Sequence, residues 1–279
     1  RYIPAMLRAF LTAAGATVML LLGAVPGHAQ LRPLDPFAWE SLDVPGAEAW
    51  LGGAWLHGQR ASLAGTEGRL IELGDLGVRW NLGRAAVEVS GTALWLYRDQ
   101  DVFAPPSGGA RPPDGRRRID TGMYLVGTAV RLAGAPDGGS LALRFGTRLP
   151  TTSNEVGLGR DATDFYSTLA GRTVSGPWHL SAEVGLGVVG TRDLANEQVD
   201  PVLFGGGARY DAGSLALLLE FTGQHDTRAG REPRGTENLG EVRLGVRAGE
   251  RRWLRLEAMR GWTRMGPEFG VRFRLGQRF

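Results

Sequence analysis

The chain ends in the stretch GVRFRLGQRF, residues 270–279, in which apolar and basic side chains alternate. Successive side chains of a β-strand point to opposite faces, so the stretch predicts a strand with one apolar and one basic face. The apolar face carries Val271, Phe273, Leu275 and Phe279, and the basic face carries Arg272, Arg274 and Arg278. A strand of a membrane barrel contacts lipid with its apolar face and turns charge toward a polar lumen. A half-buried strand of a soluble β-sandwich alternates in the same way, so the stretch alone leaves both classes open.

A targeting signal is predicted near the other end of the chain. Residues 6–8 begin a short basic region, and residues 10–25 form an almost unbroken apolar run without charge. Gly27-His28-Ala29 places small residues at the two positions that a signal peptidase reads, so we expect a signal peptide at residues 1–29. A retained transmembrane helix is the alternative, but the run is short for a span and lacks a basic stop-transfer flank.

Composition bounds the class of protein. Beyond the signal, no stretch approaches the roughly 20 apolar residues that a spanning helix needs, so any membrane span must consist of strands. The chain has no cysteine, which excludes disulfides and thiolate metal sites. All 32 basic residues are arginine, and removal of Arg1 and Arg8 leaves 30 against 29 acidic residues. This near-neutral balance gives no reason to expect nucleic acid as a partner, and we predict no cofactor and no metal site.

The rest of the sequence divides into segments of roughly ten residues with alternating polarity, which is typical of transmembrane β-strands. We count about twelve segments, and the inward or outward assignment of four is open. The clear segments are residues 75–82, 86–97, 140–149, 178–189, 214–224, 238–247, 252–262 and 268–279, and the four others are 49–58, 120–132, 164–174 and 202–210.

The connections between these segments alternate in length. Longer ones are expected at residues 59–69, 98–118, 150–160, 191–200 and 225–236, and short turns at 83–84, 135–139, 175–177, 211–213 and 248–250. Long external loops alternate with short periplasmic turns in bacterial outer-membrane barrels, whereas a soluble sandwich has no reason to keep that rhythm. The sequence therefore predicts an all-β fold, a transmembrane antiparallel up-and-down β-barrel of about 12 strands over residues 47–279, in the bacterial outer membrane.

The two ends of the predicted barrel carry further expectations. The terminal strand, which stops on Phe279, resembles the C-terminal assembly signal of outer-membrane barrels, and the resemblance implies that the barrel assembly machinery recognises this residue. Residues 30–46 contain Pro33, Pro36 and Pro45 and cannot form a central strand. They form either a periplasmic leader or a segment inside the lumen, and the sequence does not choose between the two.

The alternation also separates lumen side chains from lipid-facing ones. A charged side chain on the lipid face costs about 2 to 4 kcal/mol at mid-membrane, so charges are expected to point inward. Opposite charges beside a narrow passage orient polar or carboxylated solutes, although they could equally brace the wall through salt bridges. The candidate lumen residues are Arg144, Arg148, His179, Glu183, Arg243, Arg255 and Glu257.

Aromatic residues lie toward the predicted strand ends, as the girdles at the two membrane interfaces require. Trp95 and Tyr97 share a face with Val87 and Val89, which predicts that both rings point to lipid. The expected girdle residues are Trp50, Trp80, Trp95, Tyr97, Trp178, Trp253 and Trp262.

Residues 144–151 (RFGTRLPT), 157–161 (GLGRD) with Asp164, 176–179 (GPWH) and 184–187 (VGLG) follow one another in a recognisable order. This part of the chain, roughly residues 120–210, resembles the outer-membrane transporter-like family often labelled as the phenol-degradation meta-pathway family. The resemblance implies a barrel associated with uptake of hydrophobic or aromatic small molecules.

An enzyme is the competing class of function. His225-Asp226 is similar to the His-Asp pair of outer-membrane proteases, which also need a facing acidic pair that Asp161 and Asp164 could supply. His179 and Ser181 lie on the predicted lumen face, the wrong side for a bilayer substrate. We therefore assign no catalytic residue and favour passage of small molecules; a barrel hydrolase, either protease or lipid-modifying, and a structural or adhesive barrel are the alternatives.

A basic run borders the longest predicted loop. Arg116-Arg117-Arg118 could bind anionic lipopolysaccharide, or form a solvated charge run. The expected partners are outer-membrane lipids and lipopolysaccharide, the barrel assembly machinery and a small-molecule solute.

Overall fold

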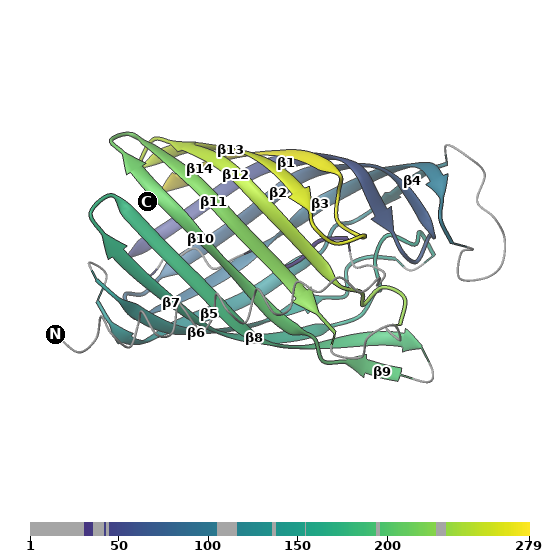
Figure 1. Cartoon of the computed structure of the whole chain (residues 1–279), viewed down its shortest axis with the longest axis horizontal. Coiled ribbons are helices and arrows are strands. Elements are labelled where there is room, and N and C mark those ends of the chain that lie inside the picture. The colour runs from purple at the N-terminus through teal and green to yellow at the C-terminus, as the bar shows by residue number, and fades with distance from the viewer. Residues whose placement is uncertain are drawn as a thin grey trace.

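The computed structural model describes residues 31–35, 42, 45–104, 116–135, 138–153, 155–193, 196–226 and 233–279. Every regular element in this part of the chain is a β-strand. None of these residues belongs to a helix with the length and apolarity that a membrane span requires. The strands form one 14-stranded sheet, and because β4 and β9 only extend it, twelve strands close into an antiparallel barrel (Figure 1).

The wall strands follow one another around the barrel in chain order. The last strand pairs with the first, with Glu48 opposite Arg278 and His57 opposite Phe269, and β8 pairs directly with β10. The short strands β4 (Arg117–Asp120) and β9 (Asn196–Val199) pair with β3 and β8. The wall strands are β1 (Gly46–Ala61), β2 (Thr66–Asn81), β3 (Ala85–Val102), β5 (Tyr124–Gly134), β6 (Ser140–Leu149), β7 (Asp164–Ser175), β8 (Trp178–Asp193), β10 (Val202–Ala212), β11 (Leu215–His225), β12 (Leu239–Ala248), β13 (Arg252–Gly261) and β14 (Phe269–Arg278).

All twelve predicted strands are present, and β6 has the predicted limits. The longer connection predicted at residues 59–69 is wrong, because β1 and β2 continue to Ala61 and from Thr66. The polar composition of this stretch is typical of a loop, yet its backbone still pairs, and Arg60 and Glu67 form a cross-strand ion pair of 2.6 Å. Tyr97 supports the hairpin by hydrogen bonding to backbone carbonyls on both strands.

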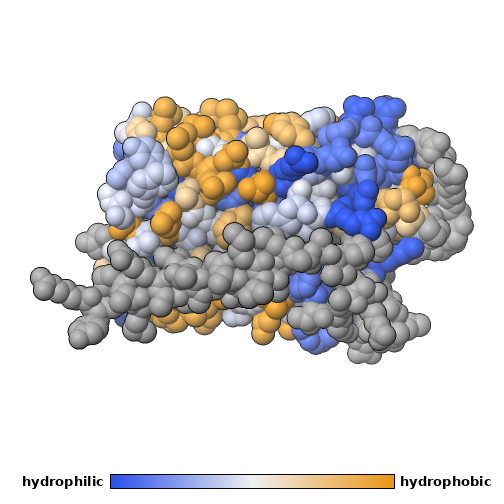
Figure 2. Space-filling model, viewed as in Figure 1, coloured by the Kyte–Doolittle hydropathy of each residue, from blue (hydrophilic) through white to orange (hydrophobic). Residues whose placement is uncertain are grey.

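Apolar side chains cover the outside of the barrel. On β14, Phe273 and Leu275 are half exposed while Arg272 is buried inside, as the alternation predicts. Figure 2 shows hydrophobic side chains gathered over much of one face, and hydrophilic ones at the end where β4 lies. An exposed apolar surface of this extent requires lipid around it, so the strands span a membrane. The chain's C-terminus lies at the opposite end from β4 (Figure 1).

The inward and outward faces switch partway along β2 and β3. Gly74, with φ of +66°, is an extra residue in the ladder between β2 and β1. Glu72 and Asp75 are therefore both buried, although three residues apart, which a regular strand does not allow. β3 keeps its register with β2 and switches too, so Trp95 and Tyr97 are only 2% and 1% exposed inside the barrel. The prediction that both rings point to lipid is wrong, because the bulge breaks the alternation.

The girdle prediction is borne out for only some of the aromatic residues. Trp80, Trp178 and Trp262 are exposed on the outside. Trp50 and Trp253 are buried and line the lumen instead. Each indole lies against a glycine on the neighbouring strand: a Cβ at Gly77 would be 2.1 Å from the Trp50 ring. These tryptophans therefore need a wall without side chains beside them, and they belong to the lumen.

Candidate functional site

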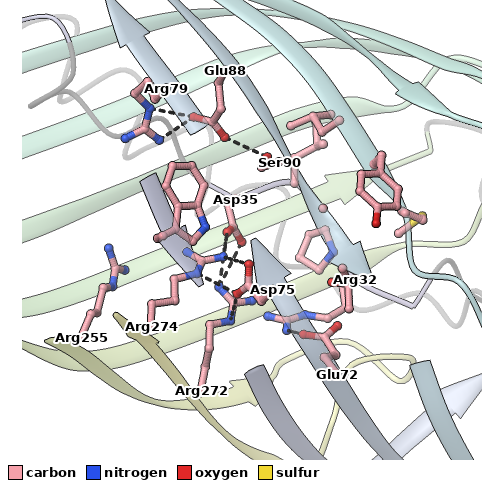
Figure 3. Close-up of a pocket in the computed structure, with 18 of the residues that line it drawn as sticks. Arg32, Asp35, Glu72, Asp75, Arg79, Glu88, Ser90, Arg255, Arg272 and Arg274 are labelled. Carbon is pink, nitrogen blue, oxygen red and sulfur yellow. Dashed lines mark hydrogen bonds and ion pairs between the residues drawn. The ribbon is translucent and has the colours of Figure 1, made fainter. Parts of the chain in front are cut away.

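The barrel encloses a cavity of about 170 Å³ that is lined mainly by charged side chains (Figure 3). Its carboxylates are Asp35, Glu48, Glu72, Asp75, Glu88 and Glu220. Its guanidinium groups are those of Arg32, Arg79, Arg144, Arg148, Arg243, Arg247, Arg255, Arg272 and Arg274. Four further carboxylates, on Asp164, Glu183, Glu241 and Glu257, form ion pairs with these arginines. Nine guanidinium groups thus meet ten carboxylates, so the site is strongly polar but nearly neutral.

Residues 31–35 lie inside the lumen. The guanidinium of Arg32 donates to Glu72 on β2 at 2.9 Å and to Glu241 on β12 at 2.8 Å, which joins two separate strands (Figure 3 shows Arg32 beside Glu72). The Thr222 hydroxyl on β11 donates to the carbonyl of Leu34 at 2.6 Å. The sequence left open whether residues 30–46 lie outside or inside the barrel; residues 31–35 occupy the lumen. The predicted signal peptide lies outside the described residues.

Three arginines surround the carboxylate of Asp35. Arg243 on β12 is 2.7 Å away, and on β14 Arg274 and Arg272 are 2.8 and 3.3 Å away. A fourth, Arg144 on β6, donates to the Asp35 carbonyl at 2.8 Å. Burial raises the pKa of Asp35, but the three guanidinium groups outweigh burial and hold that pKa well below its ordinary value. Asp35 is therefore ionised at neutral pH and links the segment to the wall.

Each of these arginines has a second acidic partner on the wall. Asp75 accepts from Arg274 at 2.7 Å, and Glu241 accepts from Arg243 at 2.6 Å. Carboxylates on both sides hold each guanidinium group in place. Each ion pair of the network therefore costs less side-chain entropy than an isolated pair would. The result is a connected ionic network across the lumen rather than separate salt bridges.

The side of the network toward the short turns combines charge with aromatic rings. Arg79 on β2 donates to Glu88 on β3 at 2.8 Å and lies over the Trp50 ring at 5.2 Å. Arg247 on β12 lies over the Trp253 ring at 4.6 Å. Cations above indole faces are stabilised by the ring quadrupole. This half of the cavity can therefore contact both a charged group and an aromatic ring of a solute.

The side toward the long loops contains an apolar cluster beside buried ion pairs. A loop folds inward after β6, and the guanidinium of Arg118 on β4 fastens it by donating to the Val156 carbonyl at 2.7 Å. The same guanidinium forms an ion pair with Asp99, so Arg118 points into the mouth and not to the surface. The buried cluster in the mouth consists of Leu31, Leu56, Ala61, Ala64, Leu70, Trp95, Tyr97, Leu158 and Met259. An apolar cluster thus lies between the charged cavity and the long loops.

The structure places most of the predicted lumen residues at this site. Arg144 lines the cavity, lies 3.6 Å from Glu183 and covers the Tyr166 ring. Arg148 lines the cavity and pairs with Asp164 at 3.0 Å. Arg243 and Arg255 also line the cavity, and Glu257 accepts from Arg255 at 2.7 Å.

His179 lies elsewhere. Its Nε2 atom is 3.0 Å from the Asp211 carboxylate, at the end of the barrel that carries the short turns, and it does not line the cavity. Asp164, one of the two acidic residues of the protease hypothesis, accepts from Arg148 and Arg160. The described residues contain no group of three or more His, Asp or Glu side chains that could hold a metal ion.

Several residues of the network were not among the candidates. Arg272 and Arg274 lie on the basic face of the terminal strand, so the same alternation could have placed them in the lumen. Glu72 and Asp75 were hidden by the bulge at Gly74. Arg32 and Asp35 precede the first strand, and no periodic pattern fixes their position.

No family model matches the chain, and no curated protein matches it. Among solved structures, it is similar to the COG4313 outer membrane channel from Pseudomonas putida F1, with 17% sequence identity and a TM-score of 0.55, over 88% of this chain and 100% of that one. It is less similar to the toluene transporter TbuX of Ralstonia pickettii, with 10% identity and a TM-score of 0.38 over 92% and 97% of the two chains. OmpF of Salmonella typhi gives 7% identity and a TM-score of 0.39 over 87% and 99%. The chain thus has the fold of bacterial outer-membrane β-barrels.

Proposed function

We propose that the protein is an outer-membrane barrel that passes small molecules slowly and selectively. The observation that carries the proposal is the charged cavity inside a membrane-spanning wall, with residues 31–35 held in it by ion pairs. The C-terminus and short turns lie in the periplasm and the long loops outside the cell. The channel description of the Pseudomonas protein supports this class of function.

Size and chemistry limit what can pass. Barrels of about twelve strands stand between the side-chain-filled eight-stranded ones and the open porins, so the lumen is narrow. A cavity of about 150 Å³ admits benzene, and this one measures about 170 Å³. Trp50 and Trp253 offer ring contacts, while the arginines around Asp35 offer anion contacts. Small aromatic solutes, with or without a carboxylate, fit this lining.

The proposed solute class also rests on the resemblance of residues 120–210 to the phenol-degradation meta-pathway family. That family is associated with hydrophobic or aromatic small molecules. The apolar cluster that includes Leu31 and Leu158 suits such solutes, because it disfavours hydrated ions more than uncharged rings. We infer that the molecules taken up through the barrel are aromatic compounds.

Passage requires residues 31–35 to move, because their ion pairs cross the lumen. Glu72→Gln with Glu241→Gln removes both acidic partners of Arg32. We expect a larger single-channel conductance in planar bilayers for this double variant than for the wild-type barrel. Glu250→Gln, in an exposed turn, is the control and leaves conductance unchanged.

The same preparations separate transport from the competing classes. A conductance that stays at background in both wild type and the double variant contradicts a passage function. Lipase or peptidase activity that is lost on His225→Ala or His179→Ala supports a hydrolase instead.

A further inference from the structure

Three exposed arginines form a row across the outside of the barrel near the long loops. Arg69 on β2 is directly opposite Arg98 on β3, and Arg98 is directly opposite Arg117 on β4. All three side chains are exposed, and none forms a hydrogen bond or ion pair with the part of the chain that the structure describes. We refer to Arg69, Arg98 and Arg117 as the arginine row.

Repulsion within the arginine row destabilises the pairing of β2, β3 and β4, and no ion pair with the described residues offsets it. Directly opposite residues on antiparallel strands have Cβ atoms about 4.5–5.5 Å apart, and like charges at that spacing destabilise the pairing. Two such like-charge pairs occur side by side here. Inside the lumen, Arg255 is likewise directly opposite Arg247 and Arg274, but there each guanidinium has a carboxylate partner. An anion bound from outside would offset the repulsion.

The next row of side chains toward the membrane is entirely apolar. Ile71 is opposite Leu96, and Leu96 is opposite Ile119. Ile119 is 61% exposed and Ile71 is also exposed, so both contact the surroundings of the barrel. Two residues along a strand span about 7 Å, so the arginine row lies just beyond the edge of the lipid-facing surface. On the face that Figure 2 shows, the side chains likewise change from hydrophobic to hydrophilic toward the β4 end.

Neighbouring charges do not cancel the row. Glu67 lies in the next row outward with Asp101, and Glu67 pairs with Arg60 at 2.6 Å. Arg118 alternates to the inside and pairs with Asp99, so the basic run at residues 116–118 does not act as one patch. The exposed cluster is built across three strands instead of along the sequence.

We propose that the arginine row binds the phosphate groups of an outer-leaflet lipid of the lipid A type, with its acyl chains along the Ile71, Leu96 and Ile119 row. Guanidinium groups bind phosphate through paired N–H donors, and three of them in register match a headgroup with more than one phosphate. The row is at the long-loop end of the barrel, which faces the outer leaflet, where phosphorylated lipid of this type is found. The apolar row supplies the contact for the hydrocarbon chains of the same molecule.

The test measures lipid binding to the purified, refolded full-length barrel by native mass spectrometry, in EDTA so that divalent cations do not bridge. The variants are Arg69→Gln/Arg98→Gln/Arg117→Gln and the single Arg98→Gln. The matched control, Arg84→Gln/Arg251→Gln/Arg252→Gln, removes three exposed arginines at the opposite end. The probes are lipid A with two phosphates, dephosphorylated lipid A, phosphatidylglycerol and inorganic phosphate. Heat-modifiable migration checks that every variant is folded.

We expect the row variant to bind two-phosphate lipid A at least about tenfold more weakly than wild type, with Arg98→Gln intermediate and the control unchanged. We also expect dephosphorylated lipid A, phosphatidylglycerol and inorganic phosphate to bind wild type more weakly than the full lipid. Equal loss in row and control variants would mean general charge attraction and overturn the proposal. Undiminished binding of dephosphorylated lipid A would mean that acyl chains alone determine it, and would also overturn the proposal. None of these outcomes depends on solute passage.

Discussion

Asp35 and Arg243 form an ion pair of 2.7 Å inside the barrel, although one precedes the first strand and the other lies on β12. Arg272 and Arg274 share the same carboxylate from β14. One side chain of the segment thus joins two strands that are separated by β13. The contact defines how residues 31–35 occupy the lumen, and the following predictions test its consequences and those of the surrounding wall.

Acid should not release the segment until the pH is low. A carboxylate whose pKa is lowered on docking contributes its full stabilisation above its free pKa, near 3.8, and loses it as pH falls through the docked pKa. Single-channel conductance should therefore stay constant between neutral pH and about pH 5, and increase only in stronger acid. Asp35→Asn should already conduct more at neutral pH and lack the acid step. A wild-type increase above pH 5 that Asp35→Asn does not show is the contrary result.

Arg144→Ala and Arg148→Ala should both shift ion preference toward cations, because each removes a positive charge from the cavity lining. Their effects on stability should differ. Asp164 keeps Arg160 when Arg148 is removed, so the loss of stability should be the smaller of the two. Glu183 loses its arginine when Arg144 is removed, which should cost on the order of 1–3 kcal/mol.

Reversal potentials across a salt gradient and urea unfolding of the two variants separate transport from bracing. Unchanged selectivity in both, with lowered stability, would make the two arginines a brace of the wall and leave them without a transport role.

Replacing Gly77 with Val should destabilise the barrel. Any Cβ at this position falls 2.1 Å from the Trp50 ring, which is itself held under Arg79. Overpacking of this kind costs about 1–3 kcal/mol, and urea unfolding in lipid vesicles measures it. Gly138→Val is the matched control, since nothing lies within 4 Å of a Cβ there. Equal midpoints for the two variants would show that Trp50 is free to move aside.

Phe279→Ala should impair assembly in cells without destabilising the refolded barrel. The ring is 67% exposed, and the residue's backbone N–H donates to the Ala47 carbonyl whichever side chain is present. The yield of heat-modifiable protein in outer membranes should fall, while the urea midpoint of refolded protein stays within error. Phe269→Ala, which replaces another exposed phenylalanine at the first position of β14, should assemble normally. Full assembly of Phe279→Ala would refute recognition of the terminal ring.

The alternation of polarity predicts the wall because lipid and lumen impose opposite requirements on successive residues. Val271, Phe273 and Leu275 show this on β14, and the outward face that the sequence predicts is the observed one. The rule fails where the backbone inserts a residue: Gly74 moves Trp95 and Tyr97 from the predicted lipid face to the lumen. Gly74, which directly precedes the predicted segment 75–82, was the available signal.

The candidate site could also be predicted only in part, and here the reason is not a bulge but contacts between distant parts of the sequence. Arg144, Arg148 and Arg243 could be assigned to the lumen because they belong to wall strands. Arg32 and Asp35 could not, because their position depends on ion pairs with residues far away in the sequence. Composition shows the charges but not their partners. The arginine row likewise arises from strand register, which neither run length nor spacing reveals.

A reversible tether on residues 31–35 tests the central claim most directly. The chain has no cysteine, so Leu34→Cys with Thr222→Cys introduces a unique pair where the Thr222 hydroxyl and the Leu34 carbonyl are 2.6 Å apart. The pair is joined by a short reducible cross-linker in the refolded barrel, and single-channel conductance is recorded before and after reduction, with each single-cysteine variant treated in the same way. We predict that conductance falls when the segment is tethered, returns on reduction, and does not change in the single variants. Equal conductance in the tethered and reduced states would contradict the account that solutes pass when residues 31–35 leave the ionic network.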